Sequence, residues 1–264
     1  RAFLDLAARA EAEFPQALHE TLGEALARLI DYQDARYAEA FLARVRRVQA
    51  ADAEGRLTRS FARRLAVWMS YEDAIRVADL KTRRGRFERI RQENAATEGG
   101  PVVVTDYLKP DLDEIYGLLP ASIGRPIARW AERRWPHGRP TLTQAVKTTT
   151  VLGFLRVWLL GRLRFLRPRS LRSQRESALM DRWEQAVLAA AALDRDLAWE
   201  VAELASVVKG YGEVRRRLSR ALDRFLAETL APAVEQDRAA GAGWERSARL
   251  VRARRQALRT EEQG

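Results

Sequence analysis

The spacing of apolar residues constrains the fold of this chain more than any other feature, because it follows the period of an α-helix. One stripe with a period near 3.6 residues consists of Leu26, Ile30, Tyr37, Phe41, Val45 and Val48. The same pattern predicts a second long helix from about Thr58 to Lys81 and later helices over about 170–192, 194–209, 213–228 and 244–259. We therefore expect an all-α fold, a multi-helix orthogonal bundle.

The stretch VVVTDYLKP, residues 102–110, departs from the helical pattern. It is rich in β-branched residues and lies between two prolines, so it is predicted to be extended. We expect at most one short extended segment, near residues 102–106. Since one strand cannot form a sheet alone, this segment is expected to cross the surface or to pair with a strand outside the chain.

Polar residues at the start of apolar runs predict where several helices begin. Asp111 and Asp194 are each expected to cap a helix. Thr141 or Thr143 is expected to cap the helix that ends before Pro168. These positions divide the second half of the chain into separate helices.

The domain organisation is expected to be simple. The sequence has 264 residues and starts at Arg1 rather than Met, which we interpret as a piece of a longer polypeptide. It contains no repeat of fixed period and no low-complexity linker. We expect residues 1–264 to form a single α-helical accessory domain, with the loop at residues 94–101 as the best candidate for an internal boundary.

The absence of cysteine narrows the chemistry of the chain. With no cysteine, the chain cannot form a disulfide scaffold, a thiolate zinc site or a cysteine-ligated iron–sulfur cluster. Only His19 and His137 remain as imidazole ligands, so no metal site is predicted. No apolar run reaches the roughly 18 residues that a membrane span needs. A cytoplasmic location without membrane contact is expected.

Common catalytic motifs do not occur in the sequence. It has no Gly-rich phosphate loop, no Gly-x-Ser-x-Gly nucleophile elbow and no His-Glu-x-x-His helix. No serine is a candidate nucleophile beside a histidine. We therefore predict no catalytic residue in this chain.

Several carboxylates fall on apolar faces of the predicted helices. Asp34 shares its angle on the helical wheel with Phe41 and Val45. In the stretch MSYEDAIRVADLK, Glu72 and Asp79 fall on the arc that carries Phe61, Leu65, Trp68 and Ile75. Because isolated carboxylates do not stay ionised in apolar surroundings, they need cations. The candidates are Arg76, Lys81, Lys147 and Lys209, with Lys147 and Lys209 as the preferred partners.

Three interpretations of these charges remain open. In the first, they form a buried ion-pair network that fixes how the helices dock. In the second, they line a pocket and shift pKa values for catalysis. In the third, a partner subunit covers these faces.

Basic residues are concentrated in one segment of a chain whose net charge is +11. Residues 156–175 hold seven arginines and no acidic residue. The candidates for binding an anion such as a phosphate are Arg162, Arg164, Arg167, Arg169 and Arg172. A solvated basic helix end is the other interpretation. Nucleic-acid binding is not expected, because few aromatic residues are interleaved with these arginines.

The segment 146–172, VKTTTVLGFLRVWLLGRLRFLRPRSLR, is apolar nearly all round through Leu160 and then basic. This profile is typical of a central core helix that emerges at the surface. Binding of a partner is the alternative interpretation.

An ordered set of segments resembles a known family. The segments are LIDYQDARYAEAFL (29–42), MSYEDAIRVADLKTR (69–83), VTDYLKP (104–110), VKTTTVLGFLRVWLL (146–160) and ELASVVKGYGEVRRR (203–217). Together they resemble the helical C-terminal region, a domain of unknown function, of indolepyruvate ferredoxin oxidoreductases. The form it resembles is the long bacterial subunit of the indolepyruvate oxidoreductase subunit beta family. The resemblance covers about residues 15–225.

The resemblance implies a complex that oxidatively decarboxylates aryl 2-oxoacids to acyl-CoA and passes electrons to ferredoxin. It implies thiamine diphosphate and iron–sulfur clusters elsewhere in that complex and no cofactor in this segment. The implied partners are a gamma-type oxidoreductase domain of the same chain and a thiamine-binding subunit. The sequence departs from the full pattern, since it has no Gly-Asp-Gly…Asn segment and no cysteine. No catalytic residue of the family can therefore be assigned here, and a structural, subunit-docking role is expected. The alternatives are binding of coenzyme A phosphates by the arginines named above and a basic nucleic-acid-binding module.

Overall fold

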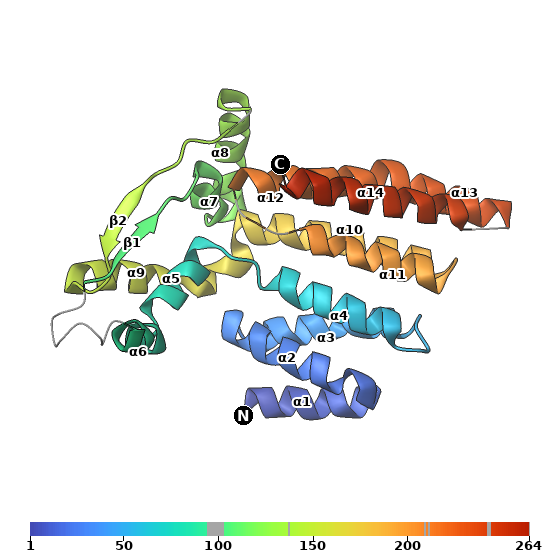
Figure 1. Ribbon diagram of the computed structural model, residues 1–264, viewed down its shortest axis with the longest axis horizontal. Coiled ribbons are helices and arrows are strands. Elements are labelled where there is room, and N and C mark those ends of the chain that lie inside the picture. Colours follow the sequence, from blue (N-terminus) through green and yellow to red (C-terminus); the bar gives the residue numbers. More distant parts are fainter. Residues whose placement is uncertain (94–102, 137, 209, 211, 242–243, 264) are drawn as a thin grey trace. The chain divides into compact units, whose positions relative to one another are not determined.

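The computed structural model describes residues 1–93, 103–136, 138–208, 210, 212–241 and 244–263. The described residues are mostly helical, which confirms the all-α prediction (Figure 1). They divide into two compact units. Unit 1 comprises Arg1–Tyr71 and Ser177–Gly264, and unit 2 comprises Glu72–Glu176. The predicted boundary at 94–101 lies outside the described residues, and the single-domain interpretation stays a prediction.

Unit 1 is built from helices that lie side by side (Figure 1). The first half of the chain supplies α1 (Ala2–Glu13), α2 (Gln16–Tyr32), α3 (Ala35–Gln49) and α4 (Arg56–Met69). The second half supplies most of α10 (Leu171–Ala191), then α11 (Arg195–Glu203), η2 (Leu204–Val207), α12 (Gly212–Arg224), the π-helical turn η3 (Phe225–Leu230), α13 (Ala231–Ala240) and α14 (Glu245–Gln263). Asp194 caps α11 by accepting a hydrogen bond from the Leu197 backbone N–H, as predicted.

The core of unit 1 is large and centred on aromatic side chains. The Phe61 and Trp183 rings stack with their centroids 4.6 Å apart. The Trp183 indole N–H donates to the Val201 carbonyl over 3.0 Å, so its one polar atom is satisfied although the side chain is fully buried. This core joins α4, α10 and α11 through apolar packing.

The predicted continuous stripe from Leu26 to Val48 is interrupted in the structure. Helix α2 ends at Tyr32, and Gln33 has the non-helical angles φ −132° and ψ −81°. Asp34 then caps α3, and its carboxylate accepts a hydrogen bond from the Tyr37 backbone N–H over 2.8 Å. Leu26, Phe41, Val45 and Val48 of the stripe are buried, and Ile30 and Tyr37 are half-buried against the same core. The periodicity therefore located the helices but not the turn between them.

Unit 2 combines shorter helices with a small sheet. Its elements are α5 (Ala74–Thr82), α6 (Arg84–Glu93), β1 (Thr105–Leu108), α7 (Leu112–Gly117), α8 (Ala121–Arg134), β2 (Gln144–Lys147), α9 (Val151–Arg162) and the 3₁₀ segment η1 (Leu163–Arg169). Among the described residues its buried apolar clusters are small. One consists of Tyr116, Ala121, Ala128, Ala131 and Leu171, and the other of Ala78, Val146 and Val157. The apolar core of this unit is therefore limited.

The extended segment pairs within the chain, which the sequence did not predict. Strands β1 and β2 form an antiparallel pair in which Thr105 lies opposite Lys147 and Leu108 opposite Gln144 (Figure 1). The expectation of at most one extended segment was therefore wrong, and so was the helix start at Thr141 or Thr143. Thr150 caps α9 instead, and its hydroxyl accepts from the Gly153 backbone N–H.

Candidate functional site

The stretch MSYEDAIRVADLK contains a break between two helices. Helix α4 ends at Met69 and α5 begins at Ala74, so the predicted continuous helix from Thr58 to Lys81 is wrong. The helical wheel that placed Glu72 on the apolar arc assumed one continuous helix. Because the helix ends at Met69, that placement does not hold for Glu72. Glu72 is exposed, and within the residues that the structure describes it makes no ion pair. The buried acid of this loop is its neighbour, Asp73.

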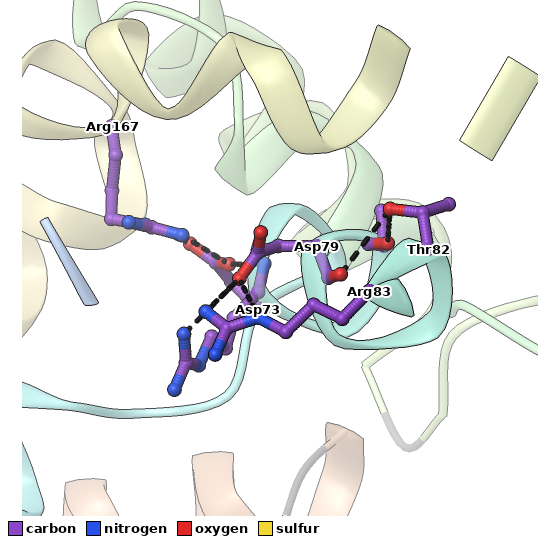
Figure 2. Close-up of polar contacts among 7 residues, drawn as sticks. Asp73, Asp79, Thr82, Arg83 and Arg167 are labelled. Carbon is purple, nitrogen blue, oxygen red and sulfur yellow. Dashed lines mark hydrogen bonds and ion pairs between the residues drawn. The ribbon is translucent and has the colours of Figure 1, made fainter. Parts of the chain in front are cut away.

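Asp73 forms a buried, two-point ion pair with Arg167 of η1 (Figure 2). The Arg167 Nε donates to one carboxylate oxygen over 2.7 Å and Nη2 donates to the other over 3.1 Å. The side chains are 2% and 4% exposed. The same carboxylate caps α5 by accepting from the Arg76 backbone N–H over 2.6 Å. Asp73 therefore fixes both the start of α5 and the position of η1.

Asp79 is paired on its own helix instead of with a distant lysine. Its carboxylate accepts from Arg76 Nη1 over 3.2 Å and from Arg83 Nε over 3.1 Å. Figure 2 shows Asp79 beside Arg83, while the Thr82 hydroxyl turns back to donate to α5 carbonyls. Because the Asp79 side chain is 41% exposed, this arrangement is that of a surface ion pair.

Lys81 does neutralise an embedded carboxylate, but the acid is Asp106 of β1. Lys81 Nζ lies 2.5 Å and Arg86 Nη2 2.8 Å from the same Asp106 oxygen. The Thr148 hydroxyl donates to the other oxygen over 2.8 Å. Burial raises the pKa of Asp106, but the hydrogen bonds from Lys81 and Thr148 and the charges of Lys81 and Arg86 outweigh it and lower the pKa. This network joins α5, α6 and the β1–β2 pair.

The remaining members of the predicted ion-pair set are not brought together. Asp34 is a half-buried helix cap in unit 1, as described above. Lys147 is exposed on β2 and has no ion pair in the described ranges. Lys209 lies outside the described residues. The preferred pair with Lys147 is therefore not found for Glu72 or Asp79 within the described residues, and the pair with Lys209 stays a prediction.

The five arginines predicted to bind an anion fall into two groups. Arg167 forms the ion pair with Asp73 described above. The Arg172 Nε lies 3.9 Å from a carboxylate oxygen of Glu176 on α10. The other three, Arg162, Arg164 and Arg169, are exposed, and none has an ion pair in the part of the chain that the structure describes. Arg162 covers the Trp158 ring at 4.7 Å from its centroid. The end of α9 and η1 therefore present three exposed arginines that have no ion pair within the described residues.

Helix α9 is not a central core helix, in contrast to the prediction. Of its 12 residues, all described, only Val157 is buried. Five large apolar side chains of α9 are exposed to solvent. Trp158 (37%) lies beneath Arg162, and the other four lie together on one side of the helix: Val151 (76%), Leu152 (77%), Leu155 (47%) and Leu159 (60%). We call these four residues the outer face of α9. Because contiguous exposed apolar surface is typical of interaction sites, this face is a candidate for one.

A cavity of about 340 Å³ in unit 1 is lined by Glu54, Arg56, Arg59, Ser60, Arg63, Arg64, Trp199 and Glu203. Its charges are largely paired. Glu203 accepts from the Ser60 hydroxyl over 2.5 Å and from Arg64 Nη2 over 2.6 Å. Burial raises the pKa of Glu203, but these hydrogen bonds and the charges of Arg64 and Arg255 outweigh burial and lower the pKa below its ordinary value. Arg56 stacks over the Trp199 ring at 4.6 Å. The wall of this cavity is thus an ion-pair network between α4 and α11.

Two kinds of feature are absent from the described residues. No group of three or more His, Cys, Asp or Glu side chains there is placed to hold a metal ion. None of the helices in those ranges combines the length and apolar character that crossing a membrane requires.

The two buried carboxylates of unit 2 that hold these networks, Asp73 and Asp106, were not predicted from the sequence, although each carries a signal. Asp73 stands directly before an apolar run, which is typical of a helix cap. Asp106 follows Thr105 and precedes the exposed Tyr107, so the alternation of a strand places it on the opposite, inner face. Each signal can be interpreted only when the start of the helix or strand that contains it is known.

Comparison with known proteins gives a family match over most of the chain. No curated protein and no solved structure matches it. A family model matches residues 18–228, which include all of unit 2 and a large part of unit 1. Since the match covers well over half of the 264 residues, the chain belongs to this family, the family of unknown function DUF6537.

Proposed function

We propose that this chain is a non-catalytic helical domain of a 2-oxoacid ferredoxin oxidoreductase subunit of the indolepyruvate type. Its role is to dock subunits in a complex that oxidatively decarboxylates aryl 2-oxoacids to acyl-CoA. The ordered resemblance between residues 29 and 217 supports this class of complex. The observation that carries the docking role is the outer face of α9, which leaves four large apolar side chains in water.

Unit 2 as a whole supports the docking role. Most of the exposed large apolar side chains among the described residues lie in this unit, including Tyr107, Ile123, Trp130, Leu142 and Phe165. Its buried clusters are small at the same time. A unit that buries little and exposes much apolar surface gains stability when another protein covers it.

The proposed partners are a gamma-type oxidoreductase domain of the same chain and a thiamine-binding subunit. The iron–sulfur clusters belong to those parts, because this chain has no cysteine with which to ligate a cluster. Thiamine diphosphate is assigned to them as well, because the chain lacks the Gly-Asp-Gly…Asn segment. The charged networks around Asp73 and Asp106 then hold the docking surface in shape and do no chemistry. The proposed location of the complex is the cytoplasm.

The test uses the parent protein, by which we mean the longer polypeptide that is proposed to contain this chain. It is purified under native conditions together with any subunits that bind it. Reduction of a viologen dye is followed with indolepyruvate, thiamine diphosphate and coenzyme A. We expect turnover, and we expect the double variant Leu155→Glu/Leu159→Glu to lose subunits in size-exclusion chromatography. Val67→Glu, which alters an exposed apolar residue of α4, is the matched control. A parent protein without 2-oxoacid-dependent turnover and without a thiamine-binding subunit would disprove the proposal.

A second candidate function is binding of an anionic ligand, such as the phosphates of coenzyme A. It is supported by Arg162, Arg164 and Arg169, which are exposed and have no ion pair within the described ranges. Salt-sensitive binding of coenzyme A in calorimetry, lost in an Arg162→Ala/Arg164→Ala variant, would favour it. No heat of binding at low ionic strength would remove it.

Nucleic-acid binding is the third candidate and rests on the same three arginines. A gel-shift assay with nonspecific DNA at low salt tests it directly. Absence of a shift removes this candidate, and a shift that persists in the arginine variant removes the role of these residues.

A further inference from the structure

The outer face of α9 has the geometry of one side of a helix–helix contact. Val151, Leu155 and Leu159 are spaced four residues apart and form a ridge, and Leu152 lies beside them. On a wheel of 100° per residue, these four positions span an arc of about 100°. The helix has 12 residues and is therefore about 18 Å long. Such a ridge matches three turns of a single partner helix.

The opposite side of α9 is occupied within unit 2. Val157 packs with Ala78 of α5 and Val146 of β2. Gly161 lies so close to α5 that a Cβ there would be 3.1 Å from the Asp79 backbone nitrogen. Figure 1 shows α9 beside α5 and the β1–β2 pair. These contacts hold the inner side of α9 against α5 and the β1–β2 pair. The outer face therefore lies on a helix whose orientation within unit 2 is fixed.

The stretch of sequence that contains this face has basic residues but no acidic ones. Residues 133–175 contain ten arginines, one lysine and no acidic residue. Arg156 stands at one flank of the ridge, and Arg162, Arg164 and Arg169 follow at its C-terminal end. None of these four has an ion pair within the described parts of the chain. A partner with acidic residues at the matching positions supplies the missing charge.

We infer that the outer face of α9 binds one amphipathic helix of a partner protein, with an apolar stripe and acidic residues along one flank and at one end. The acidic end lies beside the C-terminal end of α9, where Arg162, Arg164 and Arg169 are gathered. This inference rests on the docking role proposed above and specifies the chemistry of the partner. The contact is a helix–helix packing in which the ridge of Val151, Leu155 and Leu159 lies in a groove between side chains of the partner helix.

The arrangement of charge favours a protein helix over a lipid surface. A helix that lies on a membrane turns a strongly polar side to the water opposite its apolar side. In α9 the opposite side packs against α5 instead, and basic residues flank the ridge on one side only, at Arg156. A one-sided flank matches the single acidic edge of a partner helix.

The probes are two designed peptides of roughly 20 residues, long enough to form helix. Both carry the same leucine stripe, but one has glutamates and the other lysines along one flank and at one end. Binding of each to the 264-residue chain is measured by fluorescence anisotropy. We expect the acidic peptide to bind saturably, with an affinity that falls with salt, and the basic peptide to bind at least about tenfold more weakly.

Variants of the chain test which surface is used. Leu155→Glu/Leu159→Glu is expected to weaken binding of the acidic peptide by about tenfold or more, because two exposed anchors are lost. Arg162→Glu is expected to weaken the acidic peptide and strengthen the basic one. The matched controls Val67→Glu and Arg36→Glu change exposed residues of unit 1 and are expected to leave both affinities unchanged.

Three results would overturn the inference. The first is no binding of the acidic peptide, and the second is binding that the α9 variants do not alter. The third is α9-dependent sedimentation with phosphatidylserine vesicles, but not with phosphatidylcholine vesicles, when neither peptide binds; this would assign the face to a membrane. If the peptides fail while the chain still co-purifies with an active oxidoreductase, only this inference is lost. If the acidic peptide binds but the parent lacks that activity, only the oxidoreductase proposal is lost.

Discussion

Arg167 and Asp73 form a two-point ion pair in which both side chains are almost completely buried. The pair joins residues that are 94 positions apart in the sequence. A buried pair of this kind contributes little net stability when compared with apolar residues, but the loss of one partner leaves an uncompensated charge. Its energetic importance is therefore visible only when the two residues are changed separately and together.

We expect Asp73→Asn and Arg167→Met each to lower the free energy of unfolding by about 3–5 kcal/mol. The double variant is expected to lose clearly less than the sum of the two, because it removes both charges. Asparagine also keeps the helix cap that Asp73 provides to the Arg76 backbone N–H. Urea unfolding at neutral pH measures all three values.

The control for this cycle is Glu72→Gln, one residue away. Glu72 is exposed, so its replacement is expected to change the free energy of unfolding by about 0.5 kcal/mol or less. Additive losses in the double variant would show that the two charges are not coupled. A large loss in Glu72→Gln would show that the apolar-arc interpretation of the sequence was right about this residue.

The network around Asp106 predicts a dependence of stability on pH. The pKa of Asp106 lies below its ordinary value of 3.8, so the folded state binds the proton more weakly than the unfolded state. The stabilisation is therefore present at pH values above 3.8 and is lost as the pH falls through the lowered pKa. Hydrogen exchange of the β1 amides, measured across this range, reports the local opening of the β1–β2 pair.

Asp106→Asn and Glu72→Gln test this pH dependence as a matched pair in unit 2. The Asp106→Asn variant is expected to open more readily than the native chain at neutral pH, because Lys81 and Arg86 lose their shared partner. The difference is expected to shrink as the pH falls below the ordinary pKa. Glu72→Gln is expected to follow the native profile. A constant difference at all pH values would contradict a role of the Asp106 charge.

The sequence predicted the helical class and several caps because these depend on local patterns. Asp111 caps α7 and Asp194 caps α11, and each accepts from the backbone N–H three residues later. The break at residues 70–73 was not predicted, because the apolar period continues across it. Asp73 was missed for that reason, while Glu72 was assigned to a face that it does not reach.

Pairing over long distances in the sequence could not be predicted at all. The segment 144–147 has no strong β pattern, and it becomes a strand because β1 offers it a partner. The composition of α9 suggested burial, but composition alone does not distinguish a core helix from an unpartnered apolar face. The candidate site therefore depends on exposure, which only the structure provides.

The start of α9 leaves no room for a side chain at Gly153. A Cβ there would lie 2.1 Å from the Lys147 carbonyl oxygen, so the first turn would have to shift. We expect Gly153→Ala to destabilise α9, although alanine is favoured over glycine in a helix by about 1 kcal/mol. Gly23→Ala in α2 is the matched control, since nothing lies within 4 Å of its Cβ position. The control is expected to stabilise the chain by about 0.5–1 kcal/mol. Thermal unfolding followed by circular dichroism shows whether each substitution raises or lowers the stability of the chain. A gain of stability in both variants would contradict the close approach at Gly153.

Trp183 lies in the core and Trp130 on the surface, so substitutions of the two tryptophans compare the stability that each environment provides. Trp183 is fully buried against Phe61 and satisfies its indole N–H at the Val201 carbonyl. Trp183→Ala is expected to lower the free energy of unfolding by about 3–5 kcal/mol, because it leaves a cavity. Trp130 is 56% exposed, and its ring meets the Trp135 ring edge-on at a centroid distance of 5.2 Å. Trp130→Ala is therefore expected to cost about 1 kcal/mol or less. Urea unfolding followed by far-ultraviolet circular dichroism compares the two, and equal losses would contradict a core centred on Trp183.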